Sequence, residues 1–596
     1  MAWWTWGHWG DFQIDSGREL YVPAEILKGK LLFRDLWYMY GPLAPYVKAF
    51  LFWIFGVKLN VLFSFGLAMA FTCALLTFEV ARRFGLGPVA SAVPALYFVL
   101  ESFDPNIRNF VYPYAYAASL ACVLGMACLY FASRHATEGR TWQFALASVL
   151  GSLVVLTKQE FGIACLALLG FDLAARYWAR RDASEFFRNV AICVAALLPA
   201  AAVYGWFIWT LSPREFFYVN WIATPGSFFM HTFGKISIPA QGMRFVPREL
   251  LLASELLLLV FAEWALISRV VASSIQKWDL TSRWVIAGLA MAAFLPAWIG
   301  AIGYRWYYPW TFDEVPWAFH AVFSPMSEAV LPHGVFFPVP FFAAYALWKL
   351  VKAPRNEMAL LEAMLGIYAF LVGLRMMMSL RSTPYEATVF FNGPTVTIFF
   401  LLIYRVIRWA CQSLDEKRSR WVVANLLIAE TACCFILFLP RPSFFLPTKL
   451  TTPNGSFYTR TDAATIFPQI ISFMKSHTRN GKDILVVPEP PSLYTFAGMD
   501  APSRWYALVP GYVAPEDEHR YIEDMVSSDV RYVLLSNRDV SEYKVRGLAL
   551  GGYNPTISDW IMKNFARIGQ LGPIAGAPYP PYTMWIYERK DLIGNN

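Results

Sequence analysis

Long apolar runs, separated by short polar and basic segments, fill the chain from residue 59 to about residue 440. Most of the runs approach the roughly 20 residues that an α-helix needs to cross a ~30 Å hydrocarbon core. The pattern therefore predicts an integral membrane protein with about twelve spanning helices. The predicted spans are 59–81, 88–103, 112–133, 142–157, 161–178, 189–210, 250–268, 284–302, 336–351, 358–378, 390–408 and 421–439.

The pattern changes at Arg441, after which Pro, Gly, Asn and Asp recur at turn spacing. Short apolar runs at 483–488 and 530–535 predict buried, parallel strands, and the segments 465–475, 516–527 and 557–565 predict helices. Residues 441–596 should thus form a soluble α/β domain. The fold class predicted for the whole chain is mainly α, a polytopic transmembrane helix bundle followed by this domain. We expect the domain to act as a structural cap or acceptor platform.

Basic residues fall in alternate loops of the predicted bundle, for example at Arg82, Arg134, Arg176 and Lys349. Loops rich in Lys and Arg stay in the cytoplasm, so residues 1–58 and the C-terminal domain are expected on the other, external side of the cytoplasmic membrane. The net charge of +8 mostly reflects this distribution, and no nucleic-acid partner is expected.

The eight cysteines lie in or beside predicted helices, which argues against a disulfide framework. The sequence contains no Cys/His cluster with zinc spacing and no phosphate-binding loop motif. No metal ligands are therefore assigned.

Residues 1–58 combine a Trp-rich stub, an acidic motif and an amphipathic connector. If residues 1–58 are external, a preceding helix must carry them across the membrane, and the stub, residues 1–10, is too short and too polar to be that helix. We therefore expect that a first transmembrane helix is missing from the start. We favour a start that lies further upstream; the alternative is a stub that lies at the membrane interface, as aromatic belts do.

The segment Asp11-Phe-Gln-Ile-Asp15-Ser-Gly-Arg18-Glu19, followed by Tyr40-Gly-Pro-Leu, resembles the first external loop of the GT-C membrane glycosyltransferases. The likeness is strongest to bacterial relatives of protein O-mannosyltransferases and lipid A aminoarabinose transferases. It implies a polyprenyl-phosphate sugar as donor, and a glycan, lipid or protein as acceptor. It also implies that Asp15 is the base that accepts the acceptor's proton.

Asp15 and Glu19 are the predicted catalytic residues, because a helix would place them on one face. The alternative is that Asp15 caps a helix beginning at Ser16, with Glu19 in its first turn as a partner of the helix dipole.

Glu101 and Asp104 occupy the next external loop, where the resembled family often has a second acidic motif. They are predicted to bind substrate, either by orienting the acceptor or by holding a divalent cation together with Asp15. A solvated loop in which Asp104-Pro begins a turn is the alternative. No other cofactor is expected.

Lys158 and Glu160 interrupt two apolar runs at the predicted outer membrane face, where charged residues are usually functional or paired. Lys158 resembles a phosphate contact of the family; an internal Lys158/Glu160 pair is the alternative. Arg375 and Arg381, near the outer end of a later helix, suit a phosphate because a guanidinium binds two oxygens at once. Snorkelling of Arg375 to lipid headgroups is the competing interpretation.

Two candidate functions from different classes are consistent with these sequence features. The first is an inverting, lipid-dependent glycosyltransferase, and the second is a transporter or flippase of glycolipids. Transporters commonly show broken helices and paired halves, whereas most charges of this chain lie at helix ends and its two halves are not evidently similar. The pattern favours the enzyme.

Overall fold

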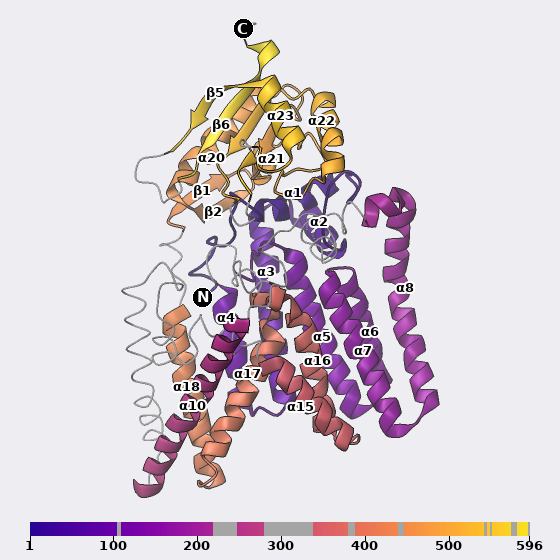
Figure 1. The fold of residues 1–596 in the computed structure, drawn as a ribbon, viewed down its shortest axis with the longest axis vertical. Coiled ribbons are helices and arrows are strands. Elements are labelled where there is room, and N and C mark those ends of the chain that lie inside the picture. The colour runs from indigo at the N-terminus through magenta and orange to yellow at the C-terminus, as the bar shows by residue number, and fades with distance from the viewer. Residues whose placement is uncertain are drawn as a thin grey trace.

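The computed structural model describes residues 1–103, 109–217, 247–278, 338–378, 388–438, 446–540, 545–548, 551–573 and 581–593. A bundle of long helices carries a smaller domain of helices and strands at one end, and the N-terminal helices lie where the two meet (Figure 1). The predicted fold class is confirmed: the chain is mainly helical, with a C-terminal region that contains a small sheet.

The helices of the bundle follow from the apolar runs. Every predicted span that falls within the described residues coincides with a helix, and the span 284–302 lies outside them. The bundle contains α3 (Leu59–Arg83), α4 (Pro88–Ser102), α5 (Tyr116–Glu138), α6 (Thr141–Val155), α7 (Gln159–Arg180), α8 (Ala183–Pro213), α10 (Pro247–Trp278), α15 (Pro338–Lys352), α16 (Glu357–Met378), α17 (Thr388–Ala410) and α18 (Glu416–Phe438).

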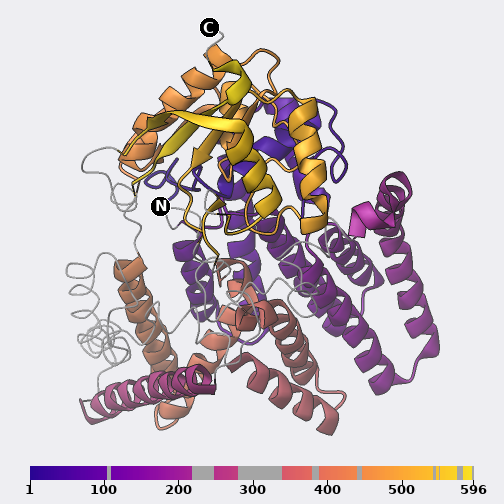
Figure 2. The same cartoon turned by 45° about the horizontal axis from the view of Figure 1, so that its top comes forward.

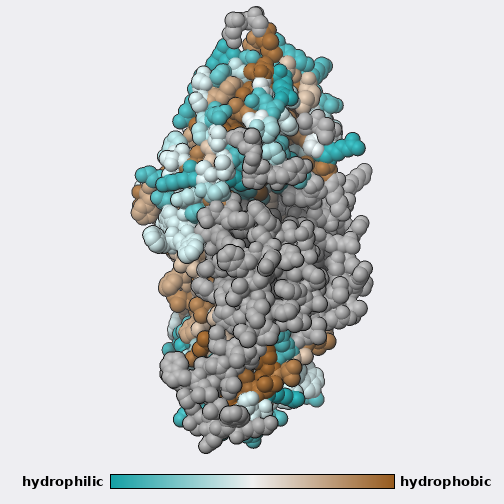
Figure 3. Space-filling model, turned by 90° about the vertical axis from the view of Figure 1, so that its left-hand side faces the viewer, coloured by the Kyte–Doolittle hydropathy of each residue, from teal (hydrophilic) through white to brown (hydrophobic). Residues whose placement is uncertain are grey.

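Among the described residues, five helices are long and apolar enough to cross a membrane, α3, α5, α7, α8 and part of α17. Hydrophilic residues cover the C-terminal domain, exposed hydrophobic residues appear on the described helices below it, and hydrophilic residues return at the far end (Figure 3). This distribution is typical of a protein that crosses a lipid bilayer several times, and the chain is a multi-pass membrane protein.

The N-terminal segment contributes two helices, α1 (Ser16–Leu27) and α2 (Leu43–Phe55). Helix α1 is buried over most of its length, whereas α2 buries Lys48 and exposes Trp53 and Phe55. In the stub, Trp3 is exposed and Trp9 is fully buried.

The C-terminal domain has a two-stranded hairpin and a mixed sheet of four strands. The elements are β1 (Thr448–Thr452), β2 (Gly455–Thr459), α20 (Thr461–His477), β3 (Ile484–Val487), α21 (Ser492–Ala497), η2 (Pro515–Asp517), α22 (Glu518–Ser527), β4 (Tyr532–Ser536), α23 (Pro555–Asn564), β5 (Phe565–Leu571), β6 (Met584–Arg589) and η5 (Lys590–Leu592). The four strands are ordered β3-β4-β6-β5. The predicted pair, β3 and β4, is parallel, and β6 runs antiparallel to β4 and β5.

The C-terminal domain packs against the N-terminal segment, residues 1–58. Figure 2, in which the top of the molecule comes forward, shows the domain over α1. The backbone N–H of Trp37 donates to the carbonyl of Arg504 at 3.0 Å. The Ser492 hydroxyl donates to the carbonyl of Phe12 at 2.9 Å. Gly17 has the Ser492 backbone so close that a Cβ would collide with it. The two ends of the chain therefore form one packed unit.

A second attachment joins the domain to the bundle. Glu215, just beyond α8, pairs with Arg504 at 2.7 Å and with Arg520 at 2.6 Å. Both arginines belong to the C-terminal domain, so α8 is anchored to that domain at this end.

Candidate active site

Asp15 directly precedes α1 and has a partly open carboxylate. Its side chain is 26% exposed and lies 3.9 Å from Nη1 of Arg18, one helical turn later. Although Asp15 occupies the N-cap position, its side chain makes no capping hydrogen bond. A capping role would require its oxygen to accept from the first turn of the helix, so the capping interpretation is wrong in this structure.

Arg18 is the centre of the site, and its side chain is almost fully buried. It donates to the Tyr512 hydroxyl at 2.9 Å and to the Tyr114 carbonyl at 2.6 Å, and its Nε lies 3.4 Å from Glu19. Burial by itself would lower the pKa of Arg18, but the neighbouring phenols and carboxylates, Tyr512 first, raise it well above its usual value. Arg18 is thus a fixed cation next to Asp15.

Glu19 is completely buried and accepts from several groups. Lys48 of α2 lies 2.5 Å from its Oε2, which also accepts from the backbone N–H of Tyr116 at 3.2 Å. Since Tyr116 begins α5, this carboxylate ties α1, α2 and α5 together. The geometry supports a positioning role, and the catalytic role assigned to Glu19 stays a prediction.

Tyr40 connects Arg18 with the second predicted cluster. The Arg18 guanidinium lies 5.8 Å from the centre of the Tyr40 ring, and the Lys158 ammonium lies 5.3 Å from the same centre. Gly41 donates to the Thr157 carbonyl at 3.0 Å, and a Cβ at Gly41 would collide with the Leu156 carbonyl. The Tyr40-Gly sequence therefore allows the connector to pack directly against the turn that carries Lys158.

Lys158 precedes α7, and its side chain is 1% exposed. Its Nζ lies 2.8 Å from Glu160 Oε1, so the predicted Lys158/Glu160 pair exists. The two groups form an ion pair whose angles do not meet the geometry of a hydrogen bond. Among the described residues, the Lys158 Nζ therefore has no hydrogen-bond partner. The ammonium thus keeps hydrogen-bond donors available although it is paired.

The C-terminal domain adds polar groups on the Asp15 side. Arg538 lies 3.1 Å from buried Glu489, and Tyr512 packs against Trp37 with ring centres 4.1 Å apart and ring planes tilted by 33°. Burial and the nearby charge of Asp15 raise the pKa of Glu489 to about 8, although Arg538 opposes the shift. Within the described residues, no three His, Cys, Asp or Glu side chains are grouped as metal ligands would be.

The remaining predicted residues are not placed here. Asp104 and Arg381 lie outside the described residues. Glu101 belongs to α4 and Arg375 to α16, but their side chains lie outside the described part of the structure. The substrate-binding roles of all four stay predictions.

Sequence reasoning did not single out three members of the site: Arg18, Lys48 and Tyr512. Arg18 carries a usable signal, because it stands three residues after Asp15 and a guanidinium suits a phosphate. The other two lie in segments with no local signature.

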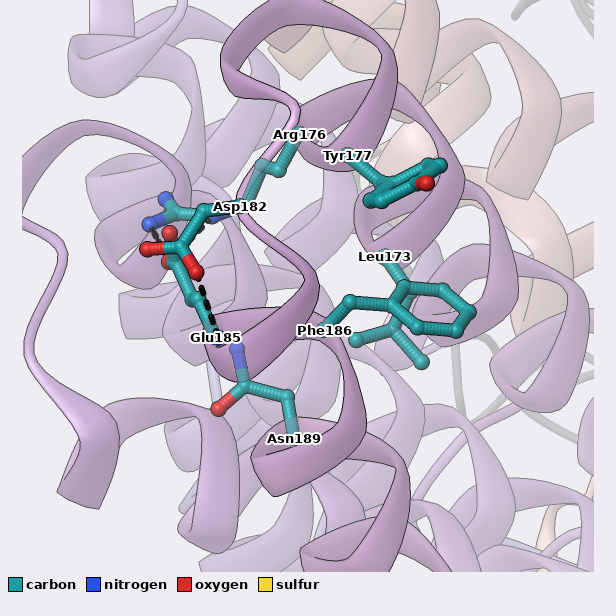
Figure 4. A pocket seen from close by; sticks show the side chains of 7 residues that line it. All are labelled: Leu173, Arg176, Tyr177, Asp182, Glu185, Phe186 and Asn189. Carbon is teal, nitrogen blue, oxygen red and sulfur yellow. Dashed lines mark hydrogen bonds and ion pairs between the residues drawn. The ribbon is translucent and has the colours of Figure 1, made fainter.

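A pocket is present elsewhere, at the end of α7 and α8 away from the C-terminal domain (Figure 4). Its lining includes Arg176, which donates from Nε to Glu185 at 3.1 Å. None of the predicted site residues lines it.

Comparisons with known proteins find similarity among solved structures. No protein-family model and no curated protein matches the sequence. Among solved structures, ArnT from Cupriavidus metallidurans bound to undecaprenyl phosphate matches 97% of this chain and 94% of its own, with 12% identity and a TM-score of 0.49. The apo state of the same protein matches over the same shares, with 12% identity and a TM-score of 0.41.

At this level of similarity the matches transfer no residue roles, so the function is argued below from the side chains of this chain.

Proposed function

We propose that the protein is an inverting glycosyltransferase that transfers a monosaccharide from a polyprenyl-phosphate donor to an acceptor hydroxyl. One observation carries the proposal: a carboxylate free of capping bonds, Asp15, lies 3.9 Å from a buried arginine, Arg18. An available base beside a fixed cation is what this reaction requires.

In the proposed reaction, the acceptor oxygen attacks the anomeric carbon of the sugar and its proton passes to Asp15. The bond between that carbon and the phosphate oxygen breaks, and polyprenyl phosphate leaves with increased negative charge. Arg18 and Lys158, which both lie near the Tyr40 ring, stabilise this charge. Arg375 and Arg381 are proposed as further phosphate contacts, and Glu101 and Asp104 as acceptor contacts.

We further propose that the site faces the periplasmic or extracellular side of the cytoplasmic membrane. Helix α3 begins next to the C-terminal domain, where the backbone N–H of Leu59 donates to the carbonyl of Asn454. It ends at Arg83, whose guanidinium donates to the carbonyl of Ser133 near the far end of α5. Arg134 and Arg176 also lie at that far end. Concentration of basic residues at one end indicates that this end is cytoplasmic. Nucleotide sugars are cytosolic, so an outward-facing site favours a lipid-linked donor.

The reaction is tested with purified protein in lipid nanodiscs, polyprenyl-phosphate sugars and a panel of glycan, lipid and protein acceptors. The expected result is acceptor-dependent release of polyprenyl phosphate, with no turnover of nucleotide sugars. A flippase would move the lipid between leaflets and leave its sugar attached. Movement without release would therefore overturn the proposal in favour of the transporter.

Sidedness is tested separately with single cysteines in a cysteine-free background. Leu27 and Ser527 are exposed at the C-terminal-domain end, and Ser184 is exposed at the start of α8. A membrane-impermeant thiol reagent should label Leu27→Cys and Ser527→Cys in intact cells, and Ser184→Cys only after permeabilisation. The reverse pattern would place the site in the cytoplasm.

A further inference from the structure

Two buried phenols, one packed against Tyr40 and one against Tyr21, have no use in the mechanism above. Tyr38, from the connector, is 1% exposed, and Tyr506, from the C-terminal domain, is 2% exposed. Among the described residues, neither hydroxyl has a hydrogen-bond partner. A buried hydroxyl without a partner is unfavourable, and phenylalanine would fill the same space without that penalty.

The position of Tyr506 is well defined by its neighbours. The backbone N–H of Ala501 donates to the Tyr21 hydroxyl at 2.9 Å, and the Tyr512 hydroxyl accepts from Arg18 at 2.9 Å. Arg18 and Tyr21 are three residues apart on α1 and so share one face. The segment 501–512 is therefore anchored near both ends to that face. Tyr506 lies between the anchors, its ring centre 5.2 Å from that of Tyr21.

The charges around Tyr506 separate it from other buried phenols. Burial raises the pKa of Tyr506, the charge of Arg18 opposes the shift, and the charges of Glu19 and Asp15 add to it. Tyr521 of α22 is equally buried and also lacks a hydrogen-bond partner among the described residues, but it packs near Trp505 inside the domain. A missing partner alone is thus no sign of a ligand. A hydroxyl without a partner indicates a ligand only when it also lies in the region of the fixed cation and the proposed base.

We propose that the C-terminal domain forms part of the substrate site, and that Tyr506, together with Tyr38, donates a hydrogen bond to a phosphoryl oxygen of the lipid donor bound at Arg18. This inference rests on the proposed function, because it assumes a polyprenyl-phosphate donor. A phosphoryl group offers several acceptor oxygens, so it can accept from phenol hydroxyls as well as from a guanidinium. The domain would then be more than a cap.

The test compares Tyr506→Phe with Tyr521→Phe in the full-length protein. Both substitutions remove one buried hydroxyl from the same domain and keep the ring. Binding of polyprenyl phosphate and of the uncharged polyprenol is measured by native mass spectrometry, and thermal unfolding is recorded for each variant. We expect Tyr506→Phe to weaken binding of polyprenyl phosphate roughly 10- to 100-fold, with polyprenol binding unchanged. Tyr521→Phe should leave binding of both lipids unchanged.

The outcomes separate this inference from the proposed function. If the unmodified protein binds polyprenyl phosphate and Tyr506→Phe binds it equally well, the inference is wrong and the donor class stands. If Tyr506→Phe loses both lipids to the same extent, the residue only supports packing, and the inference is again wrong. If the unmodified protein prefers neither lipid, the donor class and the inference fail together.

Discussion

Two buried polar clusters lie at opposite ends of the same helices and differ in where their members come from. At the end away from the C-terminal domain, His135 of α5 pairs with Asp172 of α7 at 2.8 Å, with both side chains fully buried. At the other end, Arg18 and Lys158 are joined through Tyr40, and their partners come from α1, the connector, α7 and the C-terminal domain.

The contrast separates polar groups that hold helices together from polar groups arranged for chemistry. The far cluster needs only neighbouring helices, as expected of a structural pair in a helix bundle. The cluster around Arg18 combines segments that are distant in the sequence, and it keeps one carboxylate, Asp15, partly open. The following substitutions test whether this division is correct.

The largest difference is expected between the two aspartates. Asp15→Asn should lower the transfer rate by about 10²–10⁴-fold, because it removes the proton acceptor and keeps the shape of the side chain. Asp172→Asn should lower the unfolding temperature and leave the turnover of the folded fraction nearly unchanged. Both are measured by release of polyprenyl phosphate and by thermal unfolding. Normal turnover of Asp15→Asn would remove Asp15 as the base.

Lys48→Met tests whether Glu19 is a positioning group. The substitution leaves a buried carboxylate without its closest cation, which should lower the free energy of unfolding by about 3–5 kcal/mol. The control is Arg134→Met, which breaks the solvent-accessible pair with Glu138. It should change the free energy of unfolding by less than about 1 kcal/mol. Unfolding in mixed micelles measures both. Equal effects would show that the Glu19 pair contributes little to the packing of α1.

Lys158→Ala is expected to have the smallest effect of the three, a loss of about 1.5–3 kcal/mol in the use of the charged donor, since it removes one charge-assisted contact. The control Glu160→Gln keeps the ammonium and should retain most of the activity. Donor KM and turnover are measured for both. If Lys158→Ala behaves like the control, the lysine serves only its pair with Glu160.

The helices of the bundle can be predicted from the sequence because each one corresponds to a continuous apolar run of the right length. The strands β3 and β4 can be predicted for the same reason: both are short, fully buried apolar runs. The strands β5 and β6 escape prediction because their exposed and partly buried residues, such as Arg567 and Gln570, give no continuous apolar signal.

The candidate site is predicted only where its members carry a local pattern. Asp15 belongs to a motif, and Lys158 is a charge between two apolar runs. Tyr512 gives no such signal, because its partner Arg18 lies 494 positions away. Lys48 could not be predicted for a related reason. A lysine in an apolar segment is usually interpreted as an anchor at the membrane interface, until a buried carboxylate partner is known.

The attachment of the C-terminal domain to residues 1–58 has a consequence for biosynthesis. The contacts that hold this segment, such as those of Gly17 with Ser492 and of Trp37 with Arg504, cannot form until the chain has been made as far as residues 492 and 504. Residues 1–58 therefore leave the ribosome long before they can reach their final packing. We expect the unfinished chain to be most open to proteases in its N-terminal segment, throughout the time that the helices between are being inserted.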